Sequence, residues 1–454
     1  MSTVLTYDKG TVLVQGRKPP YGLWDERAGA YRALGMEYGK LLAWGRGLPA
    51  GEFEDRAMEA LPAPRFEHSE QLRPYQQEAV EEWRRWGQMG VIVLPTAAGK
   101  THVALEAIRA VSGSTLVVVP TLDLIDQWVT KLSQVFHQEV GRLGGGAADV
   151  RPLTVSTYDS ALLRAESLGN RFDFLVVDEV HHLPSPSFRH IAEMYLAPAR
   201  LGLTATYERA DLLHLELQQL MGGKIFQRGY EELTEYLADF SLVKVKVALG
   251  PDEMEEYERH REVFTSYLRR HRMRFRGPWD FDAFIRRSWN PEGREALIAW
   301  RQARSISFNP RAKLEAVRTI LSHHRGERAI IFTDETSQAY DLSRALLVPC
   351  ITYKTGEEER REYLARFKEG RNLVLATSRV LDEGVDVPEA SVGIMLSGSG
   401  SPRQFRQRLG RILRPREGKR AVLYEVLSID TTEEGTAARR KRGMGGTARP
   451  KEDG

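Results

Sequence analysis

The sequence lacks the features that are typical of several large classes of proteins. Its 454 residues include a single cysteine, Cys350, so an internal disulfide is excluded, and no Cys/His group has the spacing of a zinc site. No apolar run approaches the ~20 residues that a membrane-spanning helix needs. The first ten residues, MSTVLTYDKG, lack the basic and apolar segments of a signal peptide. We therefore expect no membrane association and a location in the reducing cytoplasm.

A large excess of one charge is also absent. Lys and Arg number 65 and Asp and Glu 62, so the net charge of +3 does not by itself predict a nucleic-acid partner. The composition that is present, 42% hydrophobic and 28% charged residues, is typical of a globular protein. A chain of this length suggests about three domains.

The N-terminal segment, residues 1–65, differs in pattern from the rest of the chain. Two short strand-like runs flank an Asp8-Lys9-Gly10 turn, which predicts a β-hairpin. A helical stretch is expected at about residues 31–44, and Pro62 and Pro64 then indicate a linker. We expect a small mixed α/β domain here.

Two longer segments, residues 66–229 and 230–430, alternate short apolar runs with amphipathic stretches, which is typical of βαβ units in a parallel sheet. The expected strands are Val91–Leu94, Leu116–Val119, Phe174–Val177, Leu201–Leu203, Ala329–Phe332, Asn372–Ala376, Val392–Leu396 and Ala421–Tyr424. A helical insert rich in Glu, Arg and aromatic residues occupies residues 252–305. Residues 431–454 are Gly-rich and basic, which predicts a disordered tail. The fold class expected is therefore α/β, with two parallel-sheet domains.

A loop between an expected strand and an expected helix has the composition of a phosphate-binding P-loop. It consists of Pro95, Thr96, Ala97, Ala98, Gly99, Lys100 and Thr101. In such a loop, backbone N–H groups at the helix start bind phosphate. Lys100 is predicted to reach the β- and γ-phosphates of ATP and Thr101 to hold Mg²⁺.

This loop departs from the usual pattern at two positions. Leu94 and Ala97 stand where glycine is common, and a Cβ at position 97 would crowd the loop or the phosphate. The alternative is an ordinary buried strand followed by a helix N-terminus.

An acidic pair follows the apolar run that ends at Val177. Asp178 is predicted to coordinate Mg²⁺, and Glu179 to orient and deprotonate the attacking water. A strand end with solvated acids is the alternative. Because the P-loop lies upstream, we favour a catalytic pair.

The C-terminal half contributes a run of cations, QFRQRLGRILR, at residues 404–414. Gln407, Arg411 and Arg414 are predicted to complete the site, since an arginine finger stabilises charge on the transferred phosphoryl group. The alternative is a solvated basic helix or one that contacts the nucleic-acid backbone. The loop at residues 377–388 follows an expected strand and is predicted to sense both nucleotide and bound strand.

Together, these blocks resemble the conserved blocks of superfamily-2 helicases, and within them the short archaeal and bacterial XPB-type helicases. In chain order the blocks are LRPYQQ (72–77), PTAAGKT (95–101), PTLDLIDQW (120–128), VGRLGGG (140–146), VSTYDSA (155–161), DEVHHLP (178–184), TAT (204–206), IIFT (330–333), the 377–388 loop and SGSGSPRQFRQRLGRILRP (397–415). The resemblance covers nearly the whole chain apart from the tail.

The resemblance implies two RecA-like domains, a damage-recognition-like domain at 1–65 and a thumb-like insert at 252–305. It implies a 3′–5′ DNA helicase or double-strand translocase of nucleotide excision repair, driven by ATP and Mg²⁺ on duplex, forked or damaged DNA. A helicase-associated nuclease is the implied partner and the nucleoid the implied location. Arg73 and Gln76 would contact adenine, and Thr204 and Thr206 would couple hydrolysis to movement.

One departure from the family concerns the triplet after the TAT block. Where the family has Arg-Glu-Asp, implicated in duplex opening, this chain has Arg209-Ala210-Asp211. Strand separation is therefore in doubt more than ATP hydrolysis is.

Basic residues cluster with aromatics in the insert. The cations are Arg269, Arg270, Arg272, Arg274 and Arg276, and the aromatics Tyr267, Phe275, Trp279 and Phe281. We favour DNA contact for the arginines and inward packing for the aromatics. Two other functions stay open: a damage-binding protein with a vestigial ATP site, and a scaffold that positions a nuclease and unwinds weakly.

Overall fold

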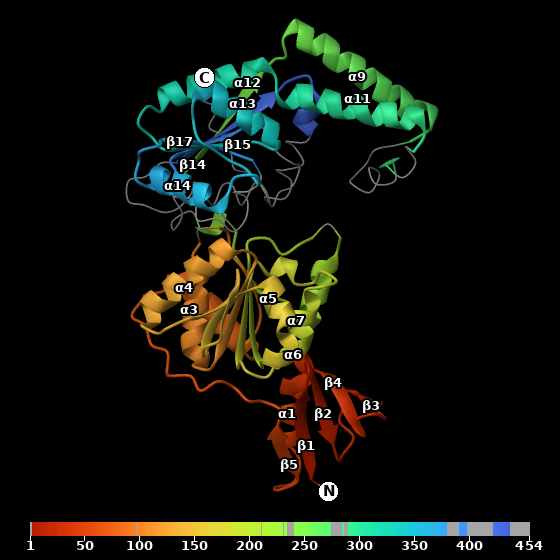
Figure 1. Cartoon of the computed structure of the whole chain (residues 1–454), viewed down its shortest axis with the longest axis vertical. Coiled ribbons are helices and arrows are strands. Elements are labelled where there is room, and N and C mark those ends of the chain that lie inside the picture. Colours follow the sequence, from red (N-terminus) through yellow and green to blue (C-terminus); the bar gives the residue numbers. More distant parts are fainter. Residues whose placement is uncertain are drawn as a thin grey trace. The chain divides into compact units, whose positions relative to one another are not determined.

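The computed structural model separates into two compact units, one containing Met1–Tyr236 and the other most of the chain from Leu237 onward (Figure 1). It describes residues 2–96, 98–209, 211–229, 231–233, 240–273, 284–285, 289–378, 390–396 and 421–435. Both units are α/β in architecture, as expected from the sequence.

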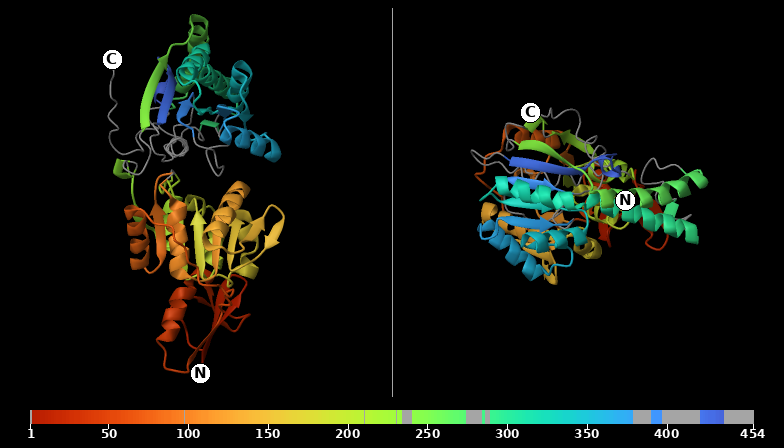
Figure 2. Two further views of the ribbon diagram at one scale, coloured as in Figure 1. Left: turned by 90° about the vertical axis from the view of Figure 1, so that its left-hand side faces the viewer. Right: turned by 90° about the horizontal axis from the view of Figure 1, so that it is seen from above.

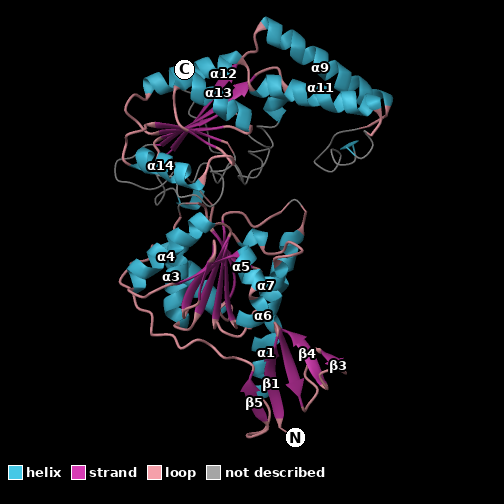
Figure 3. Ribbon diagram, in the orientation of Figure 1, coloured by secondary structure: helices cyan, strands magenta, loops and turns pink. Residues whose placement is uncertain are grey.

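A five-stranded sheet and one helix form the N-terminal part (Figure 3). Its elements are β1 (Thr3–Asp8), β2 (Thr11–Gln15), β3 (Leu23–Asp25), β4 (Ala30–Leu34), β5 (Phe53–Arg56) and α1 (Tyr38–Arg46), with strand order β3-β4-β2-β1-β5. The expected hairpin is present. Lys9 and Gly10 have φ values of 47° and 84°, which a two-residue type I′ turn requires.

The helix expected at residues 31–44 begins later than predicted. Residues 30–34 form β4, which pairs antiparallel with both β2 and β3. The helix α1 starts only at Tyr38, after a short 3₁₀ helix at Gly35–Glu37. Pairing with two strands outweighs the local helical pattern.

This N-terminal sheet is fixed to the rest of the first unit by shared packing and hydrogen bonds. Leu196 belongs to the same apolar core as Leu5 and Val12. The Tyr7 hydroxyl donates to the Ala165 carbonyl at 2.8 Å, and Asn170 Nδ2 donates to the Ala57 carbonyl at 3.0 Å.

The large sheet of the first unit has the order β13-β6-β12-β11-β7-β10-β8-β9. The strands are β6 (Met89–Val93), β7 (Thr115–Val119), β8 (Gly141–Gly144), β9 (Ala147–Asp149), β10 (Leu153–Thr157), β11 (Phe174–Asp178), β12 (Ala199–Thr204) and β13 (Lys224–Gln227). All pair in parallel except β9, which runs antiparallel to β8. Parallel pairing brings the carboxyl ends of β6, β11 and β12 to one edge of the sheet.

Helices cover both faces of this sheet, with α3 and α4 on one side and α5, α6 and α7 on the other (Figures 1 and 2). The helices of this unit are α2 (Pro74–Arg85), α3 (Lys100–Val111), α4 (Leu122–Phe136), α5 (Tyr158–Leu163), α6 (Ala165–Leu168), α7 (Arg189–Met194) and α8 (Leu217–Met221). The central strands are buried throughout, as expected for a sheet covered on both faces.

The second unit contains a six-stranded parallel sheet of order β14-β19-β18-β15-β17-β16. Its elements are β14 (Phe240–Val247), α9 (Pro251–Arg270), α11 (Pro291–Phe308), α12 (Arg311–His323), β15 (Ala329–Phe332), α13 (Thr336–Leu346), β16 (Cys350–Ile351), α14 (Glu357–Lys368), β17 (Val374–Thr377), β18 (Val392–Met395) and β19 (Ala421–Ser428). All eight strands expected from the sequence are present in the two units. Six strands of these two sheets were not expected from the sequence: β8, β9, β10, β13, β14 and β16.

The helical insert is an antiparallel pair, α9 and α11. Tyr257 packs with Ala303 near one end, and Tyr267 with Ala296 near the other. Tyr267 is buried against Phe284, with ring centroids 5.7 Å apart, as predicted for the aromatics. Phe275, Trp279 and Phe281 lie outside the described residues.

A buried ion pair holds the residues after β19 to the second unit. Lys313 Nζ of α12 contacts both Glu433 carboxylate oxygens, at 2.8 and 2.7 Å, and also donates to the Leu396 carbonyl. The side chains are 2% and 0% exposed. The predicted disordered tail therefore does not begin at Thr431, because burial of the Lys313 charge requires Glu433.

Replacing Glu433 with Gln should lower the free energy of unfolding of the second unit by about 3–5 kcal/mol, because the Lys313 charge then stays buried without its partner. Chemical denaturation followed by circular dichroism measures this. The matched control is Glu357→Gln, which breaks an exposed pair with Arg361 and should cost less than about 1 kcal/mol. Equal effects of the two changes would contradict the prediction.

Candidate active site

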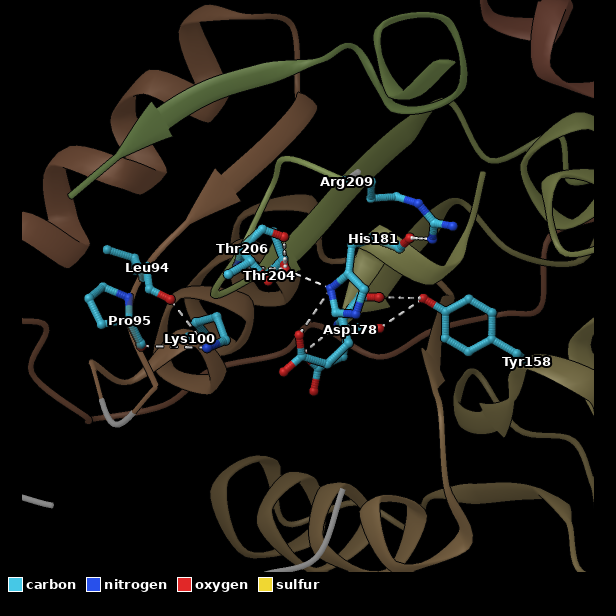
Figure 4. A network of polar contacts seen from close by, with 10 residues as sticks. Leu94, Pro95, Lys100, Tyr158, Asp178, His181, Thr204, Thr206 and Arg209 are labelled. Carbon is cyan, nitrogen blue, oxygen red and sulfur yellow. Dashed lines mark hydrogen bonds and ion pairs between the residues drawn. The ribbon is translucent and has the colours of Figure 1, made fainter. Parts of the chain in front are cut away.

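The expected P-loop connects β6 to α3. Gly99 caps the helix in the left-handed conformation, with φ of 77°, and Lys100 is the first helical residue. Lys100 Nζ donates back to the Leu94 and Pro95 carbonyls at 3.3 and 3.5 Å (Figure 4). Thr101 lies in the first turn of α3, as the second helical residue. Ala97 lies outside the described residues.

Helix α2 supports this loop from beside it. Gln76 Nε2 and the Tyr75 hydroxyl both donate to the Ala98 carbonyl, at 3.0 and 2.7 Å. Gln76 Oε1 accepts from the backbone N–H of Arg73, the residue that caps α2, at 2.9 Å. The φ of Gly99 favours glycine, and a Cβ there would lie 2.4 Å from Gln76 Nε2 and displace that amide from the Ala98 carbonyl. Arg73 and Gln76 thus lie beside the P-loop.

Changing Gln76 to Glu should raise the Kd for ATP about tenfold or more, because a carboxylate oxygen would replace the donor that faces the Ala98 carbonyl. Isothermal titration with a non-hydrolysable ATP analogue measures the change. Gln77→Glu is the charge-matched control, since Gln77 is exposed and its amide bonds only Glu81. An unchanged Kd for Gln76→Glu would show that this bond does not shape the loop.

The acidic pair lies where β11 ends. The Asp178 carboxylate is buried, and its Oδ2 accepts from Trp128 Nε1 at 3.1 Å while its Oδ1 accepts from the Glu179 N–H at 2.9 Å. Burial raises the pKa of Asp178, and the Lys100 charge acts against that rise. Lys100 and Asp178 therefore interact electrostatically across the strand ends, as a phosphate-binding cation and a metal-binding carboxylate would.

The turn after Asp178 is strained. Glu179 has φ of 48° and ψ of 49°, a left-handed conformation that non-glycine residues seldom adopt. The buried Tyr158 hydroxyl donates to the carbonyls of Asp178 and Glu179, at 2.9 and 3.2 Å. Strained backbone of this kind is characteristic of functional sites, where the surrounding structure holds it.

A chain of polar contacts leads from this turn to the end of β12 (Figure 4). His181 Nδ1 is 3.4 Å from Glu179 Oε2 and 2.9 Å from Thr204 Oγ1. The Thr204 hydroxyl donates to the Thr206 carbonyl at 2.8 Å, so its oxygen accepts from His181 Nδ1–H. The acidic turn and the predicted coupling threonines are therefore in direct contact.

Arg209 extends this chain. It donates to the His181 carbonyl and pairs with both Asp211 oxygens, at 2.9 and 2.6 Å. The Arg209 guanidinium lowers the pKa of Asp211 to about 2. Ala210, between them, lies outside the described residues.

The residues present fit a nucleotide and a magnesium ion. Thr96 Oγ1 is buried without a hydrogen-bond partner in the loop that would receive phosphate. Among the residues that the structure describes, no group of three or more His, Cys, Asp or Glu side chains forms a metal site of its own. Mg²⁺ in nucleotide sites typically takes one or two protein oxygens and the rest from phosphate and water, for which Asp178 and Thr101 are suited.

The predicted residues of the second unit are only partly described. Gln407, Arg411, Arg414 and Arg274 lie outside the described residues and stay predictions. Arg269 and Arg270 lie in the last turn of α9, and Arg272 follows it. Arg269 pairs with Glu262 and Arg270 with Glu292.

Three residues that shape the site were given no role in the prediction, although each lies inside one of the conserved blocks. They are Trp128, Tyr158 and His181. The sequence signal for each was a ring that bears a hydrogen-bonding N–H or O–H group and lies inside a motif. Their bonds to the acidic turn depend on which strands are neighbours, which the motifs do not state.

The fold and site define a P-loop nucleotide hydrolase of the helicase class. The structure superposes on the Hef helicase domain of Pyrococcus furiosus with a TM-score of 0.52 and 17% identity, over 81% of this chain and 97% of that one. This likeness shows the fold. In the part of the chain that the structure describes, no helix is long and apolar enough to span a membrane.

Three family models match the sequence. They are the type III restriction enzyme res subunit at residues 69–209, the ERCC3/RAD25/XPB C-terminal helicase at 296–444, and the Xeroderma pigmentosum group B helicase damage recognition domain at 5–57. Among curated relatives, the DNA 3′-5′ translocase XPB2 of Sulfurisphaera tokodaii is 39% identical over 96% of this chain and 99% of its own length. The DNA 3′-5′ helicase XPB of Kineococcus radiotolerans is 30% identical over 82% of this chain, which spans 62% of that protein.

The chain therefore belongs to the XPB family of DNA helicases. The predicted family, the two parallel-sheet helicase domains and the enzyme class, an ATP-dependent DNA helicase or translocase, are confirmed.

Proposed function

We propose that the chain is a 3′–5′ DNA translocase that moves on or opens damaged DNA in nucleotide excision repair. The observation that carries this proposal is a chain of polar contacts centred on His181. Its Nδ1 lies 3.4 Å from Glu179 Oε2 and 2.9 Å from Thr204 Oγ1, and its carbonyl accepts from Arg209. Such a chain lets a change at the hydrolysis site reach the residues after β12. The Saccharomyces cerevisiae relative, 27% identical, is named a helicase/translocase subunit of a general transcription and DNA repair factor, which supports a repair role.

In this proposal the first unit carries the hydrolytic chemistry. Lys100 would bind the β- and γ-phosphates, Thr101 and Asp178 would hold Mg²⁺, and Glu179 would orient the attacking water and accept its proton. Bound ATP with Mg²⁺ would supply the phosphoryl group and the free energy of its transfer. Gln407, Arg411 and Arg414 of the second unit would stabilise the charge that develops on the phosphoryl oxygens.

Coupling to movement would pass through Thr204 and Thr206. When Glu179 changes its hydrogen bonding, His181 Nδ1–H has two acceptors within reach, Glu179 Oε2 at 3.4 Å and Thr204 Oγ1 at 2.9 Å. The Thr204 oxygen also accepts from the Thr206 N–H at 3.1 Å, so the backbone of the TAT block follows the change. Arg209 and Asp211 would transmit this structural change to the bound DNA.

DNA would contact the insert through Arg269, Arg270, Arg272 and Arg274. The described pairs with Glu262 and Glu292 are on the surface, with each arginine more than 60% exposed, 69% and 66%. Exposed pairs of this kind contribute little stability, so phosphates can replace the carboxylates as partners.

We retain the predicted boundaries for the damage-recognition-like domain (1–65), the first helicase domain (66–229) and the thumb-like insert (252–305). The second helicase domain, predicted at 230–430, would extend to include Glu433. A cytoplasmic, nucleoid-associated location follows from the DNA substrate. The match of residues 5–57 to a damage recognition domain favours damaged or forked DNA.

Lys100→Ala should reduce DNA-stimulated ATPase activity about 100-fold or more, because the cation that we propose binds the transferred phosphate is lost. Phosphate release is measured without nucleic acid and with single-stranded, duplex and forked DNA. The control is Lys368→Ala, an exposed lysine at the end of α14 that should keep the parent rate. An intact chain without DNA-stimulated ATPase activity would overturn the motor proposal.

The alternative function is a damage-binding scaffold that positions a helicase-associated nuclease. The same Lys100→Ala variant separates the two. A scaffold still stimulates cleavage of forked DNA when ATP turnover is lost, whereas a motor that must first open the DNA does not.

Ala210→Glu, which restores the family's Arg-Glu-Asp triplet, should increase strand displacement on forked DNA several-fold while leaving the ATPase rate near that of the parent. Arg209 and Asp211, on either side of position 210, are already paired with each other. The variant adds the carboxylate that the family has at this position and this chain lacks. A fluorescent fork-unwinding assay measures the change. A parent that already unwinds as well as the Glu variant would show that the triplet is not limiting.

A further inference from the structure

Helix α4 directs one polar group at the hydrolysis site. Its buried face consists of Ile125, Trp128, Leu132 and Phe136, and the Trp128 ring is 3% exposed. Within this apolar face, the indole Nε1–H donates to Asp178 Oδ2 at 3.1 Å. A residue that otherwise belongs to the core thus reaches the carboxylate at the end of β11.

The two oxygens of the Asp178 carboxylate are held separately. Oδ2 accepts from Trp128, and Oδ1 accepts from the Glu179 N–H at 2.9 Å. Each carboxylate oxygen can accept a second bond, so both donors can remain in place when a cation or its water shell binds. The indole therefore fixes the rotation of the carboxylate about its last bond without occupying its metal-binding capacity.

A buried indole does not need a carboxylate to satisfy its N–H. Trp83, which is 0% exposed, donates instead to the Arg200 carbonyl at 2.9 Å. Trp128 differs because its acceptor is a charged side chain that the proposed function assigns to Mg²⁺. The backbone beneath that side chain is held independently, by Tyr158.

We propose that Trp128 is a positioning residue for the metal-binding carboxylate: its indole N–H orients Asp178 toward Mg²⁺, while Tyr158 holds the backbone of the same turn. This inference rests on the proposed function. Groups that orient a metal ligand typically affect metal affinity 10- to 100-fold. Through Trp128 on α4, the PTLDLIDQW block is thereby connected to the acidic pair.

Trp128→Phe removes the N–H and keeps a ring of similar shape. We expect the Mg²⁺ concentration that gives half-maximal binding of a fluorescent ATP analogue to rise about tenfold or more. Binding of the same analogue in EDTA should stay within about twofold of the parent, because the phosphate-binding loop is unchanged. The measurement is of binding and does not depend on turnover.

Trp83→Phe is the matched control. It removes a buried indole N–H from the same unit and should lower the melting temperature, yet leave the Mg²⁺ requirement unchanged. An unchanged Mg²⁺ requirement in Trp128→Phe, or an equal shift in both variants, would overturn the inference. Loss of the ATPase in Lys100→Ala together with an unchanged Trp128→Phe would leave the proposed function standing and refute this role alone.

The parent chain gives a second test if Trp128→Phe does not fold. With its eight tryptophans labelled at the indole nitrogen, one indole N–H resonance should shift when Mg²⁺ is added to the nucleotide complex. The same resonance should stay in place when nucleotide is added in EDTA. If no indole signal distinguishes the two conditions, Trp128 does not respond to the metal and the inference fails.

Discussion

The first unit depends on one carboxylate whose burial as a charged group is energetically unfavourable. Asp178 is buried at the end of a central strand, and burial raises its pKa. A charged group in such a position is tolerated only when fixed donors and a nearby cation surround it. Trp128, the Glu179 N–H and Lys100 supply these, and each comes from a different segment of the chain. The order of the parallel strands is what brings those segments together.

Much of this arrangement could be predicted from the sequence, because local chemistry decides it. The runs that form β6, β11 and β12 are so apolar that they are stable only in a sheet covered on both faces. Gly99 and Lys100 identify the loop between β6 and α3. The Asp8–Thr11 hairpin was equally accessible, since Lys9-Gly10 suits the turn. These features depend on a few adjacent residues.

The features that the sequence did not indicate depend on distant partners. β4 is a strand because it lies between β2 and β3, although its own residues favour a helix. Trp128 lies 50 residues from Asp178, and its contact with Asp178 becomes visible only when α4 is placed on the sheet that contains β11. The same holds for Glu433, whose position in a Gly-rich, basic segment gave no sign of burial. The family resemblance predicts roles for the motif residues, but it does not indicate these contacts.

The pair between Lys313 and Glu433 also sets an order of events during synthesis. The two residues are 120 positions apart, and the lysine lies inside the unit that the glutamate completes. While the ribosome is still adding residues beyond β18, the lysine charge has no carboxylate to meet it. The first unit has all its strands well before then and can fold as it emerges. The second unit can reach its final packing only when Glu433 has left the exit tunnel, so products cut before residue 433 would have a folded ATP-binding unit and an unfinished second one.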